Sequence, residues 1–298
     1  MVRSQATVYV GTSGWSFADW HGIVYPARPR TTDELKYLAP YLSALEVNSS
    51  FYRTPPPKMT ASWVRRTAEG FRFTFKLNRL FTHERTDWPP EEARAFKDAL
   101  RPVAEAGRLG AVLMQFPWSF RAEEASYEWL NRLHDEFRPW PLAVEVRHDS
   151  WLSDEGRYCL ELLKLSMASI DQPTLNRCIP PQVNATGPLG YVRLHGRRRD
   201  TWFARNAAPH ERYDYLYSES EIDEWVDRIR ELSRQSQEVY VFTNNHYRGQ
   251  APANAFQILS KLSGRRVPVP EPMIPYFPFL QEIAAPPESL PGEQGRLF

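Results

Sequence analysis

Cysteine, surplus charge and long apolar runs are all scarce in this sequence. The chain has two cysteines among 298 residues, Cys159 and Cys178, which are too few for a disulfide framework and lack the spacing of metal ligands. We therefore expect reduced thiols in a cytoplasmic protein. The 37 basic and 36 acidic residues leave a net charge of +1, which excludes a surface that is basic throughout but permits a local basic face. No segment resembles a secretory signal or could span a bilayer, so we expect no membrane partner.

Eight short runs rich in β-branched and aromatic residues alternate with segments of helical periodicity. Nearly every run ends in a polar or charged residue, and the runs cover residues 8–13, 44–48, 71–76, 111–115, 142–147, 167–171, 190–195 and 239–244. Thr31 with Glu34, and Ser218 with Glu221, have the spacing of capping boxes at helix starts. Alternating strands and helices are typical of parallel pairing. Eight buried strands that become polar at the same end predict an α/β fold, a (β/α)8 TIM barrel, with its working site at the C-terminal mouth.

Proline marks the two places where this pattern is interrupted. Residues 172–188 contain four prolines, so we expect an irregular sixth crossover in place of a helix. From Val267 onward, a proline-rich C-terminal extension with apolar side chains is predicted to pack on the barrel as an extended segment. We assign residues 1–284 to a single barrel domain and residues 285–298 to a flexible C-terminal tail.

Alternation along each strand places one polar set of side chains on the barrel axis. In the fifth run, Val144 and Val146 are predicted to face the helices, so Glu145 and Arg147 face the axis. The same reasoning over all runs gives a mouth lined by Glu46, Asn48, Lys76, Gln115, Glu145, Arg147, Asp171, Arg193, His195 and Asn244. Polar residues collect only toward the C-terminal ends of the runs.

Ionisable side chains at the mouth of a barrel are typical of a catalytic site. We expect Glu145 to act as the general base and Lys76 or His195 as the general acid or electrophile, and the set of predicted catalytic residues is completed by Glu46 and Asp171. The residues predicted to bind an anionic or multiply hydroxylated ligand are Arg147, Arg193, Asn48, Gln115 and Asn244. The alternative is an ion-pair network that only closes the barrel, because buried charges must be paired.

The acidic residues and His195 could also ligate a divalent metal. The sequence has no compact motif such as His-Glu-x-x-His, and Lys76 and two arginines would compete with a cation. The cofactor is therefore unknown at this stage: the residue types permit a divalent metal but do not favour one.

The loops that follow the strands are aromatic and basic. Trp15 follows the first strand and Tyr52 the second. Aromatic faces beside a polar site suit sugar rings or nucleobases, although each could instead cap the core. The long loop after the seventh strand contains Arg197, Arg198 and Arg199. We interpret these arginines as a phosphate-binding arm, or alternatively as partners of nearby acidic helices.

Several motifs resemble those of the YecE-like family, a group of TIM-barrel proteins of unknown function described as related to sugar isomerases. They are residues 11–16 (GTSGWS), 46–52 (EVNSSFY), 73–76 (FTFK), 115–117 (QFP), 145–151 (EVRHDSW), 192–196 (VRLHG) and 244–245 (NN). The resemblance extends over about residues 9–262 and implies the barrel fold. It supplies no established reaction and no established catalytic residues.

The wider analogy is to xylose-isomerase-like barrels, which include sugar isomerases and an abasic-site endonuclease. These enzymes place carboxylates and histidines around divalent metals. Of the seven histidines in this chain, only His83, His148, His195 and His246 lie near strand ends. A histidine-rich trinuclear zinc site is therefore not expected, and the endonuclease mechanism does not transfer simply.

The last five residues, 294–298 (QGRLF), resemble the peptide by which bacterial replication and repair proteins dock on the DNA sliding clamp. Gln294, Leu297 and Phe298 occupy the matching positions. A flexible segment can reach the groove of a partner in this way. The alternative is an ordinary unstructured end.

Three functions are therefore consistent with the sequence. The first is an enzyme, isomerase-like or a phosphoester hydrolase, that acts on a sugar, a sugar phosphate or another anionic polyol at the mouth. The second is a protein that binds nucleic acid or repairs DNA, using Arg197, Arg198 and Arg199 and recruited to the sliding clamp through its last residues. The third is a binding module without catalytic activity.

Overall fold

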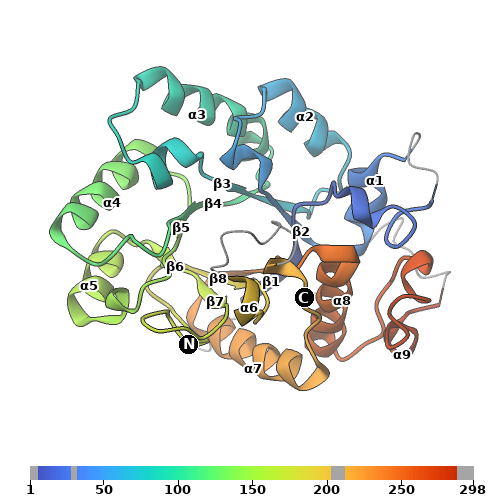
Figure 1. The fold of residues 1–298 in the computed structure, drawn as a ribbon. Helices are drawn as coiled ribbons and strands as arrows, with labels where there is room; N and C mark the ends of the chain where they lie inside the picture. Colours follow the sequence, from blue (N-terminus) through green and yellow to red (C-terminus); the bar gives the residue numbers. More distant parts are fainter. Residues whose placement is uncertain (1–5, 28–31, 203–211, 287–298) are drawn as a thin grey trace, which may run out of the picture.

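A ring of parallel strands, surrounded by helices, forms the body of the protein (Figure 1). The computed structural model describes residues 6–27, 32–202 and 212–286. The strands are β1 (Thr7–Ser13), β2 (Ala44–Val47), β3 (Arg72–Lys76), β4 (Leu109–Gln115), β5 (Leu142–Glu145), β6 (Ser166–Met167), β7 (Ser169–Asp171), β8 (Leu189–Leu194) and β9 (Glu238–Thr243). Their order in the sheet is β6-β5-β4-β3-β2-β1-β9-β8-β7.

The two outermost strands of this order, β6 and β7, together occupy one strand position of the barrel, the sixth. Only Ala168 separates them, and its backbone N–H donates to the carbonyl of Val144 in β5 at 2.8 Å. Since β6 pairs with β5 while β7 pairs with β8, the sheet curls into a barrel with eight strand positions. The predicted (β/α)8 barrel is confirmed.

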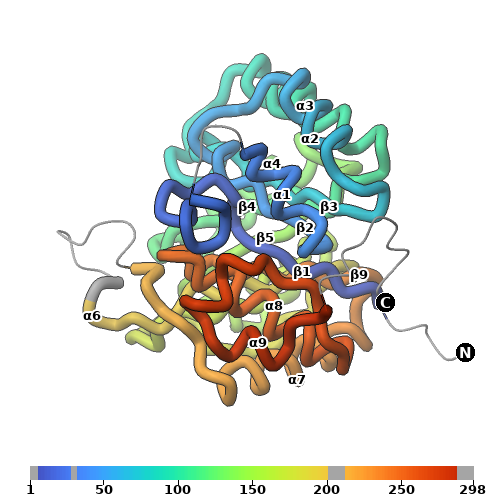
Figure 2. The backbone as a smooth tube through the Cα atoms, turned by 90° about the vertical axis from the view of Figure 1, so that its right-hand side faces the viewer, coloured from blue at the N-terminus to red at the C-terminus, as the bar shows by residue number. Residues whose placement is uncertain are grey.

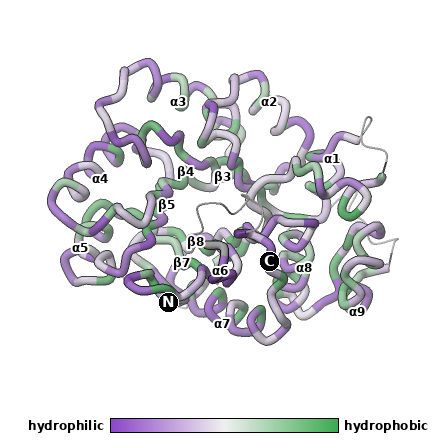
Figure 3. Tube along the Cα trace, in the orientation of Figure 1, coloured by the Kyte–Doolittle hydropathy of each residue, from purple (hydrophilic) through white to green (hydrophobic). Residues whose placement is uncertain are grey.

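Helices follow the strands around the outside of the ring. They are α1 (Glu34–Leu38), α2 (Pro57–Arg65), α3 (Pro90–Glu105), α4 (Glu124–Phe137), α5 (Asp154–Leu162), α6 (Arg199–Trp202), α7 (Glu219–Gln235), α8 (Gln250–Ser263) and α9 (Leu280–Ile283). Along these helices apolar stretches alternate with polar ones (Figure 3), as expected where one face of a helix covers a sheet. Helix α7, for example, buries Ile222, Trp225, Ile229 and Leu232.

The two predicted capping boxes have different outcomes. Ser218 and Glu221 form the expected reciprocal box at the start of α7. The box expected between Thr31 and Glu34 is wrong, because α1 begins at Glu34 and its cap is Asp33, whose carboxylate accepts from the backbone N–H of Lys36 at 3.1 Å. Aspartate is among the strongest N-cap residues, and Thr31 lies outside the described residues.

The sixth crossover is irregular, as predicted. Residues 172–188, all of which the structure describes, contain no helix. Instead, side-chain hydrogen bonds connect this segment to the outer side of the sixth strand position, β6 and β7. The hydroxyl of Ser169 accepts from the N–H of Asn184 at 2.9 Å, and the hydroxyl of Thr186 donates to the carbonyl of Leu165 at 2.6 Å. The outer face of β6 and β7 is therefore covered by polar groups rather than by an apolar helix.

The proline-rich segment after α8 packs on the barrel, as predicted, but it is not simply extended. It contains a 3-10 turn, η9 (Glu271–Met273), and the short helix α9, which lies against α8 (Figure 2). Proline suits the first positions of helical turns because its φ is already fixed there. Val267 donates to the carbonyl of Ile283 at 2.9 Å and closes the segment into a loop, while Met273 and Leu280 are buried.

The predicted tail falls largely outside the described part of the chain. Ala285 still donates to the carbonyl of Val267 at 2.8 Å, whereas residues 287–298 are not described. The proposed docking residues Gln294, Leu297 and Phe298 lie there, so clamp binding stays a prediction. Among the described residues, no helix combines the length and the apolar character that crossing a membrane requires.

Large side chains fill the interior at the N-terminal end of the barrel. Tyr240 stacks on Tyr9 with 5.2 Å between ring centroids. A side chain at Gly110 would meet the Tyr240 ring at 2.6 Å, so glycine is required there. Tyr191 and Phe242 continue the filling, with ring centroids 5.5 Å apart. The fully buried charged side chains Glu46, Glu145 and Arg193 consequently lie above this filling, toward the C-terminal half of the barrel.

Candidate functional site

An arginine between two glutamates lies at the centre of the barrel. Arg193 from β8 donates through Nε to Glu46 Oε2 at 3.0 Å and through Nη2 to Glu46 Oε1 at 2.5 Å, and its Nη1 donates to Glu145 Oε2. All three side chains are buried. We call Glu46, Arg193 and Glu145 the inner cluster; it joins β2, β8 and β5, which are far apart in the sequence.

Two neutral hydroxyls complete the surroundings of Glu46. Ser13 Oγ donates to Glu46 Oε1 at 2.7 Å, and Tyr191 Oη donates to Glu46 Oε2 at 2.8 Å. Both residues were absent from the predicted site. Ser13 could have been found from its place at the end of the first strand, beside Glu46 in the register of β1 and β2. Tyr191 lies on β8 two residues before Arg193, so the two side chains share the inward face.

Glu145 is held as an anion. Burial by itself would raise the pKa of this carboxyl group, but the charges of Arg193 and Arg147 and a hydrogen bond from His195 outweigh burial and hold the pKa well below its usual value. Arg147 donates to Glu145 Oε1 through Nη2 at 2.9 Å and is itself only 17% exposed. Each oxygen of Glu145 therefore faces cations, and Arg147 lies on the side nearer to solvent.

His195 lies beneath the mouth as an uncharged ring. Burial lowers its pKa to about 4, since the attraction of Glu145 only partly offsets the loss of solvent and Arg193 opposes protonation. The amide of Asn244 donates to Nδ1 at 3.0 Å, so the ring proton is on Nε2, which faces Glu145 Oε1 at 3.3 Å. This arrangement makes His195 a donor to Glu145 at neutral pH.

Lys76, at the end of β3, is a cation of the mouth that lacks a carboxylate partner among the described residues. Within the described part of the chain, its ammonium group makes no ion pair or hydrogen bond, and it lies 4.0 Å from the centre of the Phe51 ring. The side chain is half-buried. Burial, followed by repulsion from Arg193, lowers the pKa of Lys76 to about 7. The amine is therefore present in both protonation states near neutral pH.

Asp171 does not face the barrel axis, so its predicted inward position is wrong. In the register of β7 and β8, Ile170 is opposite the inward-facing Arg193 and Asp171 is opposite Leu194. The carboxylate of Asp171 instead accepts from Trp225 Nε1 in α7. The polar character of Asp171 did not indicate its orientation, because the outer face of β7, which no apolar helix of the sixth crossover covers, is polar as well.

Arg197 binds Asp171 on this outer side. Its Nη2 donates to Asp171 Oδ2 at 2.8 Å and its Nη1 to Glu221 Oε1 at 2.8 Å. We call Asp171, Arg197 and Glu221 the outer cluster; it fastens the loop after β8 to the start of α7. Burial raises the pKa of Asp171, and the bonds from Arg197 and Trp225 offset this effect only in part.

The three arginines predicted to form a phosphate-binding arm are in different situations. Arg197 is engaged by the outer cluster, and Arg198 pairs with Asp200 at 3.3 Å and with Asp214 at 3.0 Å. Arg199, in the short helix α6, is exposed. Pairing with acidic neighbours, the alternative interpretation of this loop, thus describes two of the three.

The remaining predicted ligand-binding residues lie around the mouth. Asn48 is half-buried after β2, and Gln115 ends β4, where its amide donates to the carbonyl of Phe116 at 3.3 Å. Trp15 packs edge-on against Trp63 with 5.3 Å between ring centroids, whereas Tyr52 is 74% exposed. Gln115 is thus beside Glu145 in the register of β4 and β5, and Trp15 serves partly as packing.

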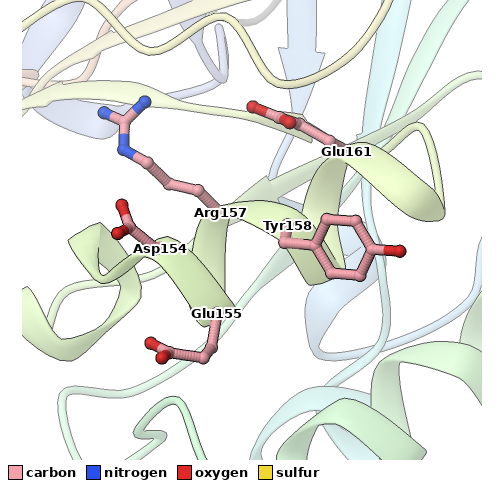
Figure 4. Close-up of a pocket in the computed structure, with 5 residues that line it drawn as sticks. All are labelled: Asp154, Glu155, Arg157, Tyr158 and Glu161. Atoms are coloured by element: carbon pink, nitrogen blue, oxygen red, sulfur yellow. The ribbon is translucent and has the colours of Figure 1, made fainter.

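No group of three or more histidine, cysteine, aspartate or glutamate side chains in the described residues is arranged to hold a metal ion. A surface hollow lies elsewhere, along α5, and is lined by Asp154, Glu155, Arg157, Tyr158 and Glu161 (Figure 4). All five side chains come from one helix and point in different directions around it. This hollow brings no reactive groups together, so the barrel mouth is the better candidate for a functional site.

The fold and the buried Glu-Arg-Glu cluster define a TIM-barrel protein with ionisable groups at the C-terminal ends of its strands. The chain belongs to the family described as protein of unknown function DUF72, whose model matches residues 9–275. This confirms the resemblance to YecE-like proteins.

Relatives and solved structures agree with this membership. The chain is 29% identical to UPF0759 protein YunF of Bacillus subtilis, over 86% of this chain and 94% of that protein. It is 28% identical to UPF0759 protein YecE of Escherichia coli, over 49% of this chain and 50% of that one. A crystal structure of a DUF72 family protein from Thermotoga maritima has 38% identity and a TM-score of 0.78, over 86% of this chain and 99% of that one. One from Enterococcus faecalis has 26% identity and a TM-score of 0.76, over 86% and 95%.

Proposed function

We propose that this protein is an enzyme that transfers a proton on a small, anionic, sugar-like molecule, with Lys76 as the group that gives and takes the proton. The observation that carries this proposal is the position of Lys76: an amine at the C-terminal end of a barrel strand, half-buried and, within the part of the chain that the structure describes, without a carboxylate partner. A pKa of about 7 suits proton transfer at neutral pH, because both forms of the amine are then populated.

The distribution of charge around the mouth supports an anionic ligand. The carboxylates of Glu46 and Glu145 are fully buried, whereas Lys76 and Arg147 retain some exposure. A ligand that enters from the mouth therefore meets the cations first. The side-chain amides of Asn48 and Gln115, which lie close by, can donate to and accept from hydroxyl groups.

This proposal gives Glu145 a positioning role and leaves proton transfer to Lys76. A carboxylate whose two oxygens already accept from Arg193 and Arg147 is a weak base. Glu145 and Glu46 instead hold the guanidinium of Arg193 below the amine. The positive charge of Arg193 then helps to keep the pKa of Lys76 low.

The test is hydrogen exchange on candidate substrates. The protein is incubated in D2O with a panel of aldoses, ketoses and their phosphates, and loss of the C–H signal next to the carbonyl is followed by proton NMR. We expect exchange with at least one compound, and a loss of about a hundredfold or more in Lys76→Gln. Lys58→Gln is the matched control, since Lys58 is an exposed lysine of α2.

Two outcomes would contradict the proposal. Exchange that continues unchanged in Lys76→Gln would remove Lys76 from the reaction. Binding of a panel member without any exchange would favour the module without catalytic activity.

A further inference from the structure

The turn that follows β3 has an unusual backbone. Residues Leu80–Glu84 form one turn of π-helix, η5, and Arg85 follows in the left-handed region with φ 51°. Such turns are rare and occur often at functional sites. Phe81 is buried, and its carbonyl accepts from Trp129 Nε1 of α4 at 2.8 Å. The turn is thus held firmly against the helical layer while its polar side chains remain near the mouth.

Two cations at or beside this turn have no carboxylate partner in residues 6–27, 32–202 and 212–286. Lys76 lies over the Phe51 ring, and the guanidinium carbon of Arg85 lies 5.2 Å from the centre of the Phe120 ring. Neither forms an ion pair with any residue that the structure describes, and Nε of Arg85 is buried there without a hydrogen-bond acceptor. A buried donor left unpaired is costly, so this position is suited to an acceptor from outside the chain. Arg79, in contrast, pairs with Glu84 at 3.1 Å.

His83 lies on the same turn, two residues before Arg85, and remains uncharged. Its ring contacts the Phe51 ring edge-on at 4.8 Å, so His83 and Lys76 share the same aromatic neighbour. Burial and then the charges of Lys76, Arg147, Arg79 and Arg85 lower the pKa of His83 to about 4. Several positive charges therefore converge on one imidazole.

We propose that this turn is an anion subsite that binds the phosphate group of a phosphate monoester, with Arg85 and Lys76 as its charged donors and His83 beside them. Arg85 with its full positive charge and Lys76 with a partial one, both without a carboxylate partner in the described residues, match the charge of a phosphate monoester, about −1.5 to −2 at pH 7, better than the single charge of a carboxylate. Arg85 can offer its unpaired Nε together with a second N–H in the forked geometry that arginine uses for phosphate. The inference rests on the proposed function for its choice of a small-molecule ligand, and it narrows the substrate class to phosphorylated compounds.

The test uses inorganic phosphate and the imidazole signal of His83 in NMR spectra of the full chain. We expect saturable shifts of this signal with phosphate and a rise in the pKa of His83, because the bound anion offsets the neighbouring cations. Arg85→Gln should weaken phosphate binding by about tenfold or more. Arg79→Gln is the matched control and should stay within about twofold, since this arginine is exposed and already paired with Glu84. Thermal melting of both variants verifies that they are folded.

Glycerol 3-phosphate and a short single-stranded DNA then distinguish the sources of the phosphate group. Competition by glycerol 3-phosphate that depends on Arg85 supports the proposal. No shift of the His83 signal with phosphate, equal losses in Arg85→Gln and Arg79→Gln, or competition by DNA alone would overturn it. The outcome is separable from that of the proposed function: phosphate binding without proton exchange removes only the reaction, and exchange without phosphate binding removes only the subsite.

Discussion

The inner and outer clusters contain the same charges but have different surroundings. Each places one arginine between two carboxylates: Arg193 between Glu46 and Glu145, and Arg197 between Asp171 and Glu221. Arg193 is 2% exposed and is surrounded by strands, whereas Arg197 is 26% exposed and joins a loop to a helix. The pKa of Glu145 is lowered and that of Asp171 is raised. Residue type alone thus fixes neither the protonation behaviour nor the role of an ion-pair cluster.

The largest expected effect comes from removing the inner arginine. Arg193→Met leaves Glu46 and Glu145 buried without their guanidinium partner, and we expect a loss of about 3–5 kcal/mol in the free energy of unfolding. Urea denaturation measures it. Adding Glu46→Gln and Glu145→Gln to this variant should restore part of the loss. A loss below about 1 kcal/mol would show that solvent reaches the inner cluster.

The next largest expected effect is a loss of folding stability in acid, to which the groups of the two clusters contribute in opposite directions. His195 has a folded-state pKa of about 4, below its ordinary 6.5, so the unfolded chain binds protons more readily between these values. Stability is then lost as the pH falls from about 6.5 to 4, by on the order of 3 kcal/mol for this residue. Glu145 adds a loss in the same direction below its ordinary pKa, while the raised pKa of Asp171 acts in the opposite direction.

Urea denaturation between pH 7 and pH 4 tests this dependence in the intact protein and in His195→Asn. The variant should show the weaker dependence on pH. His83 and His148, whose pKa values are also lowered, are present in both proteins, so their contributions cancel in the difference. Equal slopes in the two proteins would contradict the assignment of a neutral His195.

Removing the outer arginine should cost less. Arg197→Met leaves Asp171 buried, but Trp225 still donates to it and Glu221 remains accessible to solvent. We expect a loss of about 1–3 kcal/mol in the free energy of unfolding. The comparison requires this loss to be smaller than that of Arg193→Met under the same conditions. A larger one would mean that the loop after β8 has a structural role beyond these ion pairs.

The smallest expected effect is a change in the pKa of Lys76 when a carboxylate of either cluster is neutralised. Glu145 raises the pKa of this amine, while Asp171 is not among the groups that shift it. Glu145→Gln should therefore lower the pKa of Lys76 by about one unit, and Asp171→Asn should leave it unchanged. NMR titration of the lysine signal, assigned through Lys76→Gln, measures both. Equal shifts would mean that the carboxylates of the two clusters act equally on the amine of Lys76, which would contradict this comparison.

Much of the fold and part of the site could be predicted from the sequence. The strand runs and their alternation correctly placed Glu46, Glu145, Arg193 and His195 together, since period-2 alternation fixes which side chains share a face. The same reasoning failed for Asp171, because a three-residue strand that is polar on its outer side offers no apolar face from which to assign its orientation.

The cation cluster after β3 could not be predicted in this way. His83 and Arg85 lie on an irregular turn, and neither alternation nor helical periodicity indicates where such side chains point. That Lys76 lacks a carboxylate partner among the described residues is likewise invisible in the sequence. Glu46 lies on the neighbouring strand β2 and Glu145 two strands away on β5, and either could have paired with it.

The sequence by itself determined the barrel, its proline-rich crossover and the polar mouth, because these follow from local periodicity and from the geometry of proline. Only the tertiary structure decided that Arg193 binds both glutamates and that Lys76 has no carboxylate partner among the residues it describes. It also decided that Asp171 faces α7. The physical reason is that the pairing of charges, and the protonation that results, depends on distance and burial among strands that are far apart in the chain.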